Sequence, residues 1–216
     1  MFRLRHLLRF AALAVVLGSA APALAQTIID EWSSIKAPPA PELKAVTLDP
    51  KATAVLAMDF VKQTCNENRP RCLASIPNVE KLLAAARAKG VLVIHTTVPP
   101  VPIADTLPAV APMGNEPVVV ALLDKFILGN QDTGLEKMLK DKGITTVIAI
   151  GTAANGAVLY TASAAASRGF NVIVPVDGMS ASGPTPFIEQ FVAYNFTSAP
   201  VISAKITLTR IDMITF

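Results

Sequence analysis

The chain alternates short apolar runs with longer segments whose apolar residues recur at helical spacing. Five runs rich in β-branched residues lack the polar–apolar alternation of a half-exposed strand, and a sixth is expected around 201–208. Continuous apolar runs of this length are typical of strands buried on both faces of a parallel sheet. The five runs are Thr53–Met58, Val91–His95, Pro117–Leu122, Thr145–Ile150 and Asn171–Val176.

Helices are predicted between these strands. The helical patterns cover Asn78–Lys89, Thr133–Lys142, Ala154–Arg168 and Pro184–Tyr194. The first three each end in a basic residue followed by glycine, a common signal at the C-terminus of a helix. Strand–helix–strand repetition with short links favours right-handed βαβ units. The pattern therefore predicts a three-layer α/β/α fold with a doubly wound, mostly parallel sheet of about six strands.

The first 25 residues have the pattern of a secretory signal peptide. A charged start is followed by an apolar run at 10–21 and by the small-residue cleavage site Ala23-Leu24-Ala25. As a helix, a run of this length would extend about 18 Å, short of the ~30 Å hydrocarbon core of a bilayer. We therefore expect export, cleavage, and a periplasmic or secreted protein that is free of the membrane afterwards.

The remaining sequence divides into two regions. Residues 26–50 are rich in Pro and polar residues and are expected to form an N-terminal arm laid over the domain. Residues 51–216 carry all the predicted strands and helices, so they are expected to form one α/β domain.

The charge of the chain belongs mainly to the signal segment. The full sequence has 19 Lys+Arg, 16 Asp+Glu and a net charge of +3. Arg3, Arg5 and Arg9 lie in the signal segment, and without these three the chain carries 16 basic and 16 acidic residues. A nucleic-acid binder needs a surplus of Lys and Arg on one face. We therefore expect no nucleic-acid partner.

The two cysteines are Cys65 and Cys72. An even number in an exported chain favours a disulfide, which here would close a small loop. One alternative is that one of them is a relocated nucleophile. A zinc site is disfavoured because the exported part has a single histidine, His95. We expect no metal and no cofactor.

Several candidate site residues lie where the predicted strands end. In a doubly wound sheet the ligand binds beyond the carboxyl ends of the strands. After the first, third and fourth strands these positions hold Asp59, Phe60, Lys125, Phe126, Thr152, Ala153 and Asn155. The Pro-rich stretch 96–117, after the second strand, is long enough to act as a lid.

Four segments resemble the isochorismatase-like hydrolases, a group that includes nicotinamidases and N-carbamoyl amidases. They are Ala54–Phe60 (AVLAMDF), Asp124–Phe126 (DKF), Gly151–Ala162 (GTAANGAVLYTA) and Gly169–Ala181 (GFNVIVPVDGMSA). The resemblance implies a Rossmann-like fold. It also implies that Asp59 is a general acid or base, that Lys125 is the catalytic lysine, and that the Thr152–Ala153 peptide bond is cis.

The chain departs from the amidases of this family at Ala157, where the resemblance places the nucleophilic cysteine. Alanine cannot form a thioester, so the covalent route is closed at this position. Isochorismatases also lack the cysteine and are thought to protonate a vinyl ether with the aspartic acid. We therefore expect a small carbonyl or vinyl-ether substrate, hydrolysed by general acid–base chemistry of Asp59 and Lys125.

A second hypothesis is a catalytically inactive family member that binds a small ligand or a protein partner through the former active-site pocket. The candidate binding residues also have structural alternatives. Phe60 and Phe126 would wall the pocket or belong to the core, and Asn155 would contact substrate or satisfy backbone groups of its turn. Family members commonly self-associate, so a homo-oligomer stays open.

Overall fold

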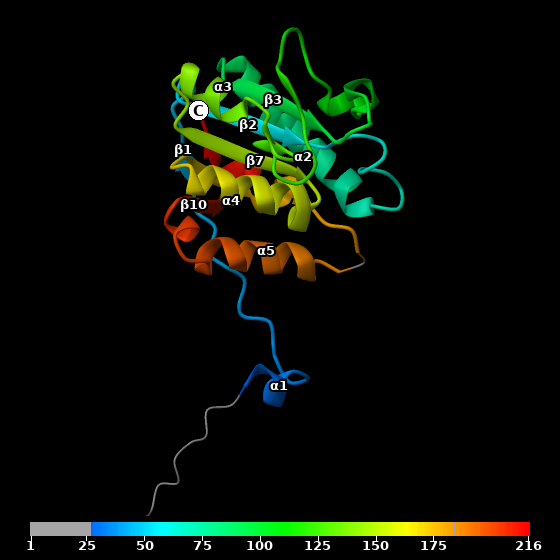
Figure 1. Cartoon of the computed structure of the whole chain (residues 1–216), viewed down its shortest axis with the longest axis vertical. Coiled ribbons are helices and arrows are strands. Elements are labelled where there is room, and N and C mark those ends of the chain that lie inside the picture. The colour runs from blue at the N-terminus through cyan, green and yellow to red at the C-terminus, as the bar shows by residue number, and fades with distance from the viewer. Residues whose placement is uncertain (1–26, 184) are drawn as a thin grey trace, which may run out of the picture. The chain divides into compact units, whose positions relative to one another are not determined.

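The structure is a computed structural model that describes residues 27–183 and 185–216 (Figure 1). Residues 27–37 and the described residues from Pro38 onward belong to two separate units. In the first, helix α1 (Ile28–Glu31) follows Thr27, whose N–H and hydroxyl both donate to Asp30 Oδ2. The predicted signal peptide at 1–25 lies outside the described residues.

A parallel sheet of seven strands forms the centre of the second unit, counted over the residues that the structure describes. The strand order is β10-β8-β7-β2-β3-β4, with β9 also beside β7. The strands are β2 (Thr53–Met58), β3 (Leu92–Thr97), β4 (Val118–Val120), β7 (Thr146–Thr152), β8 (Asn171–Pro175), β9 (Met179–Ser180) and β10 (Ile206–Thr209). The predicted mostly parallel sheet is therefore confirmed, with β9 as an additional short strand.

Strand β2 lies in the middle of this sheet because every one of its residues is apolar or small enough to be buried. All six are buried, and Leu56 pairs with Ile94 of β3 on one side and with Ala149 of β7 on the other. A strand covered on both faces needs no polar alternation. This explains why its bounds match the sequence prediction residue for residue.

Helices cover both faces of the sheet. One face packs against α3 (Leu135–Asp141), α4 (Leu159–Ser167) and α5 (Phe187–Ser198), and the other packs against α2 (Pro70–Ala88). Successive strand residues alternate between the two core layers, so Leu56 belongs to the first and Val55 to the second. Together with the sheet, these helices make the three layers predicted from the sequence.

Helix α2 begins at Pro70, although the sequence pattern predicted a start at Asn78. Pro70 occupies the first turn, where a missing N–H costs nothing. Pro77 lies inside the helix and removes one hydrogen bond there. The buried face of the helix, with Val79 and Leu83, offsets that loss through contact with the sheet.

Two smaller pairs of strands lie outside the main sheet. β1 (Val46–Thr47) pairs in parallel with β11 (Ile214–Thr215), and the N–H of Leu48 donates to the Thr215 carbonyl. β5 (Ile127–Leu128) and β6 (Gln131–Asp132) form an antiparallel hairpin. Residues 38–50, part of the predicted arm, thus belong to the compact unit.

The Pro-rich stretch after β3 is anchored by a half-buried polar cluster. Glu116 accepts hydrogen bonds from Arg87 Nε at 2.7 Å and from the ring of His95 at 2.8 Å, while Arg87 also donates to the Ala111 carbonyl. Burial lowers the pKa of His95, so the imidazole is neutral and donates its Nε2–H to the carboxylate. The cluster ties this segment to α2 and β3.

None of the helices in the described parts of the chain is long and apolar enough to cross a membrane.

Candidate active site

Asp59 directly follows the central strand β2 and adopts an unusual backbone conformation. Its φ is +59°, a left-handed value that aspartate tolerates better than most residues. The hydroxyl of Thr64 donates to the Asp59 carbonyl, and the Asp59 N–H donates to the carbonyl of Thr96 at 3.3 Å. These contacts fix the backbone that presents the carboxyl group at the carboxyl end of the sheet.

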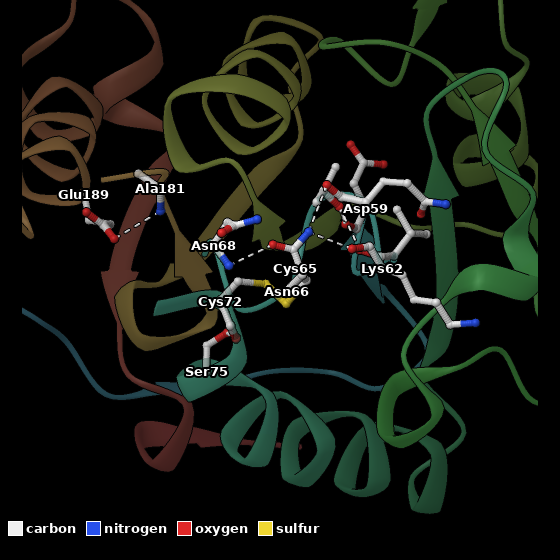
Figure 2. Close-up of a disulfide and its surroundings, with 12 residues drawn as sticks. Asp59, Lys62, Cys65, Asn66, Asn68, Cys72, Ser75, Ala181 and Glu189 are labelled. Carbon is white, nitrogen blue, oxygen red and sulfur yellow. Dashed lines mark hydrogen bonds between the residues drawn. A yellow bond between two sulfur atoms is a disulfide. The ribbon is translucent and has the colours of Figure 1, made fainter. Parts of the chain in front are cut away.

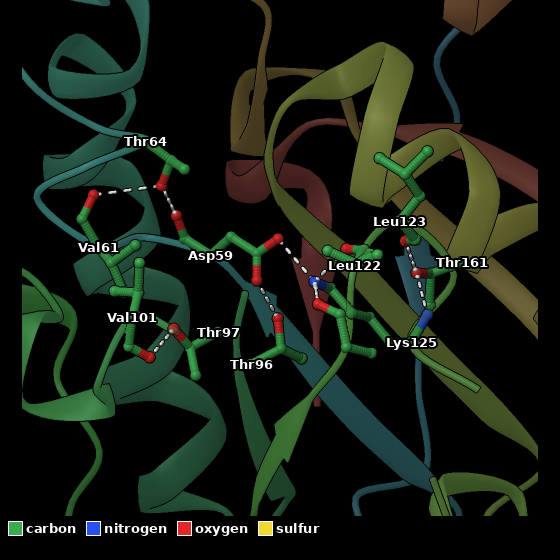
Figure 3. Close-up of polar contacts among 11 residues, drawn as sticks. Asp59, Val61, Thr64, Thr96, Thr97, Val101, Leu122, Leu123, Lys125 and Thr161 are labelled. Carbon is green, nitrogen blue, oxygen red and sulfur yellow. Dashed lines mark hydrogen bonds and ion pairs between the residues drawn. The ribbon is translucent and has the colours of Figure 1, made fainter. Parts of the chain in front are cut away.

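Lys125 reaches the same point from the loop after β4 and is 0% exposed. Its Nζ donates to Asp59 Oδ2 at 2.7 Å and to the carbonyls of Ala121 at 2.9 Å and Leu122 at 2.8 Å (Figure 3). Three acceptors match the three protons of an ammonium group. Asp59 and Lys125, which the sequence analysis predicted to act together, are therefore in direct contact in the structure.

The hydroxyl of Thr96 completes the surroundings of the carboxyl group by donating to Asp59 Oδ1 at 2.5 Å. Burial raises the pKa of Asp59, although Lys125 and Thr96 act in the opposite direction. Burial also lowers the pKa of Lys125, against the attraction of Asp59. Because water stabilises neither charge, a proton on Asp59 costs less free energy than it would on an exposed aspartate.

The chain turns sharply at the end of β7, next to this pair. Gly151 has a φ of +149°, and a Cβ there would collide with the Met58 carbonyl oxygen, so the close approach of β7 to β2 requires glycine. The Thr152–Ala153 peptide bond is cis, as the family resemblance implied. A π-helical turn at Ala154–Val158 then leads into α4.

The position of the family's cysteine, Ala157, lies in this π-helical turn and is buried. Thr152 is buried at the end of β7, Ala153 is half-buried, and Asn155 is exposed. The turn thus carries the predicted residues on one continuous segment beside the strand end that adjoins Asp59.

The two candidate aromatic residues lie in opposite core layers. Phe126 is 1% exposed, stacks on Phe170 with 6.4 Å between ring centroids, and lies under the Arg168 guanidinium. Phe60 is 2% exposed and belongs to the apolar cluster on the α2 side. Their packing is that of the structural alternative, in which both rings belong to the core.

Sequence reasoning did not single out Thr96 or Thr64, although both hydrogen-bond to Asp59. The sequence could have identified Thr96 as a candidate, because it is a polar residue near the carboxyl end of a predicted strand, as Asp59 is. Thr161 of α4 accepts the Lys125 N–H at 3.1 Å and donates to the Leu123 carbonyl. It therefore positions the loop that carries the lysine.

Cys65 and Cys72 form the predicted disulfide, with 5.3 Å between their Cα atoms (Figure 2). Both are bonded and buried, so neither supplies a free thiol nucleophile. The bond links the loop that follows Asp59 to the first turn of α2.

Within the described residues, no group of three or more His, Cys, Asp or Glu side chains is arranged to hold a metal ion.

Comparisons with known proteins agree on the fold. The family model described as isochorismatase domain matches residues 53–205. A cysteine hydrolase from Pseudomonas syringae pv. phaseolicola 1448A is 20% identical, with a TM-score of 0.66 over 80% of this chain and 94% of that one. An isochorismatase from Pseudomonas putida KT2440 is 17% identical, with a TM-score of 0.64 over 88% and 100%.

An N-carbamoylsarcosine amidase from Thermoplasma acidophilum is 21% identical, with a TM-score of 0.61 over 74% of this chain and 96% of that one. None of the curated proteins matches the sequence significantly. At these identities the solved structures establish the shared fold.

Proposed function

Because the chain belongs to the isochorismatase family, we propose that it is an exported hydrolase that acts on a small carbonyl or vinyl-ether compound without a cysteine nucleophile. Asp59 and Lys125 supply general acid–base chemistry. The observation that carries this proposal is the buried contact of 2.7 Å between Lys125 Nζ and Asp59 Oδ2 at the carboxyl end of the sheet. Export is supported by the disulfide, since such bonds persist in oxidising compartments.

The proposed reaction uses Asp59 first as an acid. Its raised pKa favours the protonated carboxyl group that a general acid needs when the substrate arrives. With a vinyl ether, Asp59 gives its proton to the terminal vinyl carbon, and water adds to the resulting cation and returns a proton to Asp59. The hemiketal formed in this way then breaks its carbon–oxygen bond to give a ketone and an alcohol.

Lys125 and the turn after β7 have supporting roles in this scheme. The ammonium group balances the carboxylate that forms when Asp59 has given up its proton. The N–H groups of the turn that contains Ala153 and Asn155 would bind a carbonyl or anionic oxygen of the substrate.

A second candidate function is binding without catalysis. Two observations favour it: Ala157 offers no nucleophile, and the three donors of Lys125 are all satisfied by acceptors within the protein. A site of this kind would bind a small ligand or a segment of a partner protein without transforming it.

A substrate screen distinguishes the two functions. The purified protein is assayed with vinyl ethers, amides and carbamoyl compounds, and each hit is repeated with Asp59→Asn and Lys125→Ala. The matched controls are Asp141→Asn and Lys137→Ala, which remove the partners of an exposed ion pair of similar length. Hydrolysis that is lost in the first two variants alone supports the enzyme. Ligand binding without turnover, or turnover that survives both substitutions, overturns it.

A further inference from the structure

The loop that follows Asp59, residues 60–69, leads from the end of β2 to the start of α2. It contains a turn around the carbonyl of Val61, which accepts the N–H groups of Thr64 and Cys65, each at 2.9 Å. This turn places the Thr64 hydroxyl so that it donates to the carbonyl of Asp59 (Figure 3). The loop therefore contacts the backbone of the residue to which we assign the acid–base chemistry.

The two halves of this loop are held in different ways. In the first half, the N–H of Lys62 donates to the Asp105 carbonyl at 3.0 Å, and the Gln63 side chain donates to the Asp105 carboxylate at 2.6 Å. In the second half, the hydrogen bonds that the structure describes for residues 64–68 all stay within 59–69. The disulfide is therefore the bond that fixes this second half to α2.

The far end of the disulfide is well anchored. Cys72 lies in the first turn of α2 and is 0% exposed. The preceding residue, Arg71, donates through Nε to Glu189 Oε1 of α5 at 2.6 Å, and the same oxygen accepts the N–H of Ala181 at 3.0 Å (Figure 2). The disulfide thus connects Cys65 to a point where several elements of the domain meet.

The backbone of Asp59 depends on such support. Its φ of +59° lies in the left-handed region, which is unfavourable for a residue with a Cβ. Its carbonyl accepts the Thr64 hydroxyl, and its N–H donates to the Thr96 carbonyl at 3.3 Å. Without the Thr64 contact the backbone is free to return to the extended or right-handed region, which would turn the carboxyl group away from Lys125.

We propose that the disulfide, acting through Thr64, positions the carboxyl group of Asp59, so that the site is complete only in the oxidised chain. The disulfide fixes Cys65, and Cys65 fixes its neighbour in the turn. Closing the bond removes two protons and two electrons from the two thiols, and a disulfide of a second molecule accepts them as it is reduced to two thiols. This inference rests on the proposed function only in treating Asp59 as the reacting group.

An NMR titration of Asp59 tests the inference without a substrate. The 13C signal of its carboxyl carbon is followed against pH in the unaltered protein, in Cys65→Ala/Cys72→Ala and in Thr64→Val, which keeps the shape of threonine but has no hydroxyl. In both variants water should reach the carboxyl group, so its pKa, which burial raises, should fall toward the ordinary value of an aspartate. Thr64→Ser keeps the hydroxyl and should titrate like the unaltered protein.

Two control variants separate positioning from stability. Leu139→Ala leaves a cavity in the core under α3 and lowers the stability without touching the loop. Thr197→Val removes a hydroxyl of α5 that donates to the Tyr194 carbonyl at 3.0 Å. Both should leave the titration of Asp59 unchanged.

The proposal is overturned if the titration is unchanged in either Cys65→Ala/Cys72→Ala or Thr64→Val, because the groups removed then serve stability alone. The unaltered protein kept in reductant, with both thiols counted by mass spectrometry, should titrate like the double cysteine variant. If that variant does not fold, the comparison of Thr64→Val with Thr64→Ser decides the case, since both keep the disulfide.

The rate of any hydrolysis that the substrate screen finds gives a second readout. A misplaced reacting group lowers kcat more than it weakens substrate binding. The kcat of the double cysteine variant and of Thr64→Val should therefore fall about tenfold or more, with KM changed less than about threefold. Thr64→Ser should recover most of the rate. A rise in KM at constant kcat would overturn the positioning role.

The two readouts separate this inference from the proposed function. A titration that shifts as expected in a protein that hydrolyses nothing keeps the positioning role and removes the hydrolase. Hydrolysis at full rate in Thr64→Val and in the double cysteine variant keeps the hydrolase and removes the positioning role.

Discussion

Lys125 Nζ lies 2.7 Å from Asp59 Oδ2, and both side chains are withdrawn from solvent. Asp59 directly follows strand β2, and Lys125 lies in the loop after strand β4. A buried ion pair is costly to desolvate and adds little net stability over an apolar pair. The proposed chemistry, and not stability, therefore gives this pair its place at the carboxyl end of the sheet in our hypothesis.

Breaking this pair is expected to destabilise the fold. Asp59→Asn or Lys125→Met alone leaves a buried charge without its partner and should lower the free energy of unfolding by about 3–5 kcal/mol. The double variant should lose less than the sum of the two, because neither charge remains. Urea denaturation checks this. The exposed Lys137–Asp141 pair is the matched control, and its removal should hardly move the midpoint. Additive losses at Asp59 and Lys125 would contradict the expectation.

The proposed hydrolase activity is expected to fall as pH rises. A general acid must carry its proton, and the protonated fraction of Asp59 decreases as pH increases through its pKa, which burial has raised. Lys125→Met removes the positive charge that holds this pKa down, so the falling limb should move to higher pH. The pH profile of kcat/KM measures both effects. A rate that rises with pH would instead assign Asp59 as a base.

Acid is expected to destabilise the cluster of Arg87, His95 and Glu116. Burial lowers the folded pKa of His95 below its ordinary value of 6.5, so unfolding takes up a proton and stability is lost as pH falls below about 6.5. Burial alone would raise the pKa of Glu116, but hydrogen bonds from Arg87, Met113 and His95 hold it below 4.5. Its contribution is therefore lost at still lower pH.

Melting temperatures measured from pH 8 to pH 3 separate these two contributions. His95→Gln should flatten the curve between about pH 7 and 5, and Glu116→Gln should flatten it below about pH 5. Identical curves for the variants and the unaltered protein would show that the cluster does not set acid stability.

The disulfide is expected to stabilise the loop after Asp59. Cys65 and Cys72 are separated by seven positions, and closing a loop of this size contributes about 2–3 kcal/mol by the chain-entropy relation. Replacing both cysteines with alanine should lower the free energy of unfolding by this amount. Urea denaturation with and without reductant checks the value, and mass spectrometry reports the bond itself. Identical midpoints with and without reductant would mean that the bond adds no stability.

A cysteine at position 157, where the family resemblance places the nucleophile, is expected to allow covalent attack on a substrate carbonyl. The sequence holds two cysteines and both are bonded, so Ala157→Cys introduces one free thiol. With an amide, the thiol should displace ammonia or an amine and form a thioester, and with a carbamoyl compound a thiocarbamate, each visible as a mass increase of the intact protein. Ser167→Cys, at an exposed position of α4, is the control that should form none. Equal adducts at both positions would show that Ala157 is not placed for attack.

Local pattern was sufficient to predict most of the fold. All six residues of β2 are buried, so the apolar composition of this run is enough to predict the strand. β9 has only two residues, too few to show a pattern, and it exists because β7 extends far enough to pair with it. The start of α2 was missed because Pro77 reads locally as a helix boundary, whereas burial against the sheet decides otherwise.

Some residues of the site could likewise be predicted from the sequence, and others could not. Asp59 and Lys125 could be assigned because each follows a strand and matches a family motif. The contact of Glu189 with Arg71 and Ala181 joins α5 to α2 and to the end of β9. No periodicity in the sequence encodes such a meeting of distant side chains, which depends on how the layers pack.

The pairing of β1 with β11 sets the order in which the domain can be completed. Thr47 lies beside Thr215, so its partner is synthesised 168 positions later. Contacts this remote in sequence form only when the whole intervening segment is available. A nascent chain that has left the ribosome through β10 therefore still has an unpaired first strand.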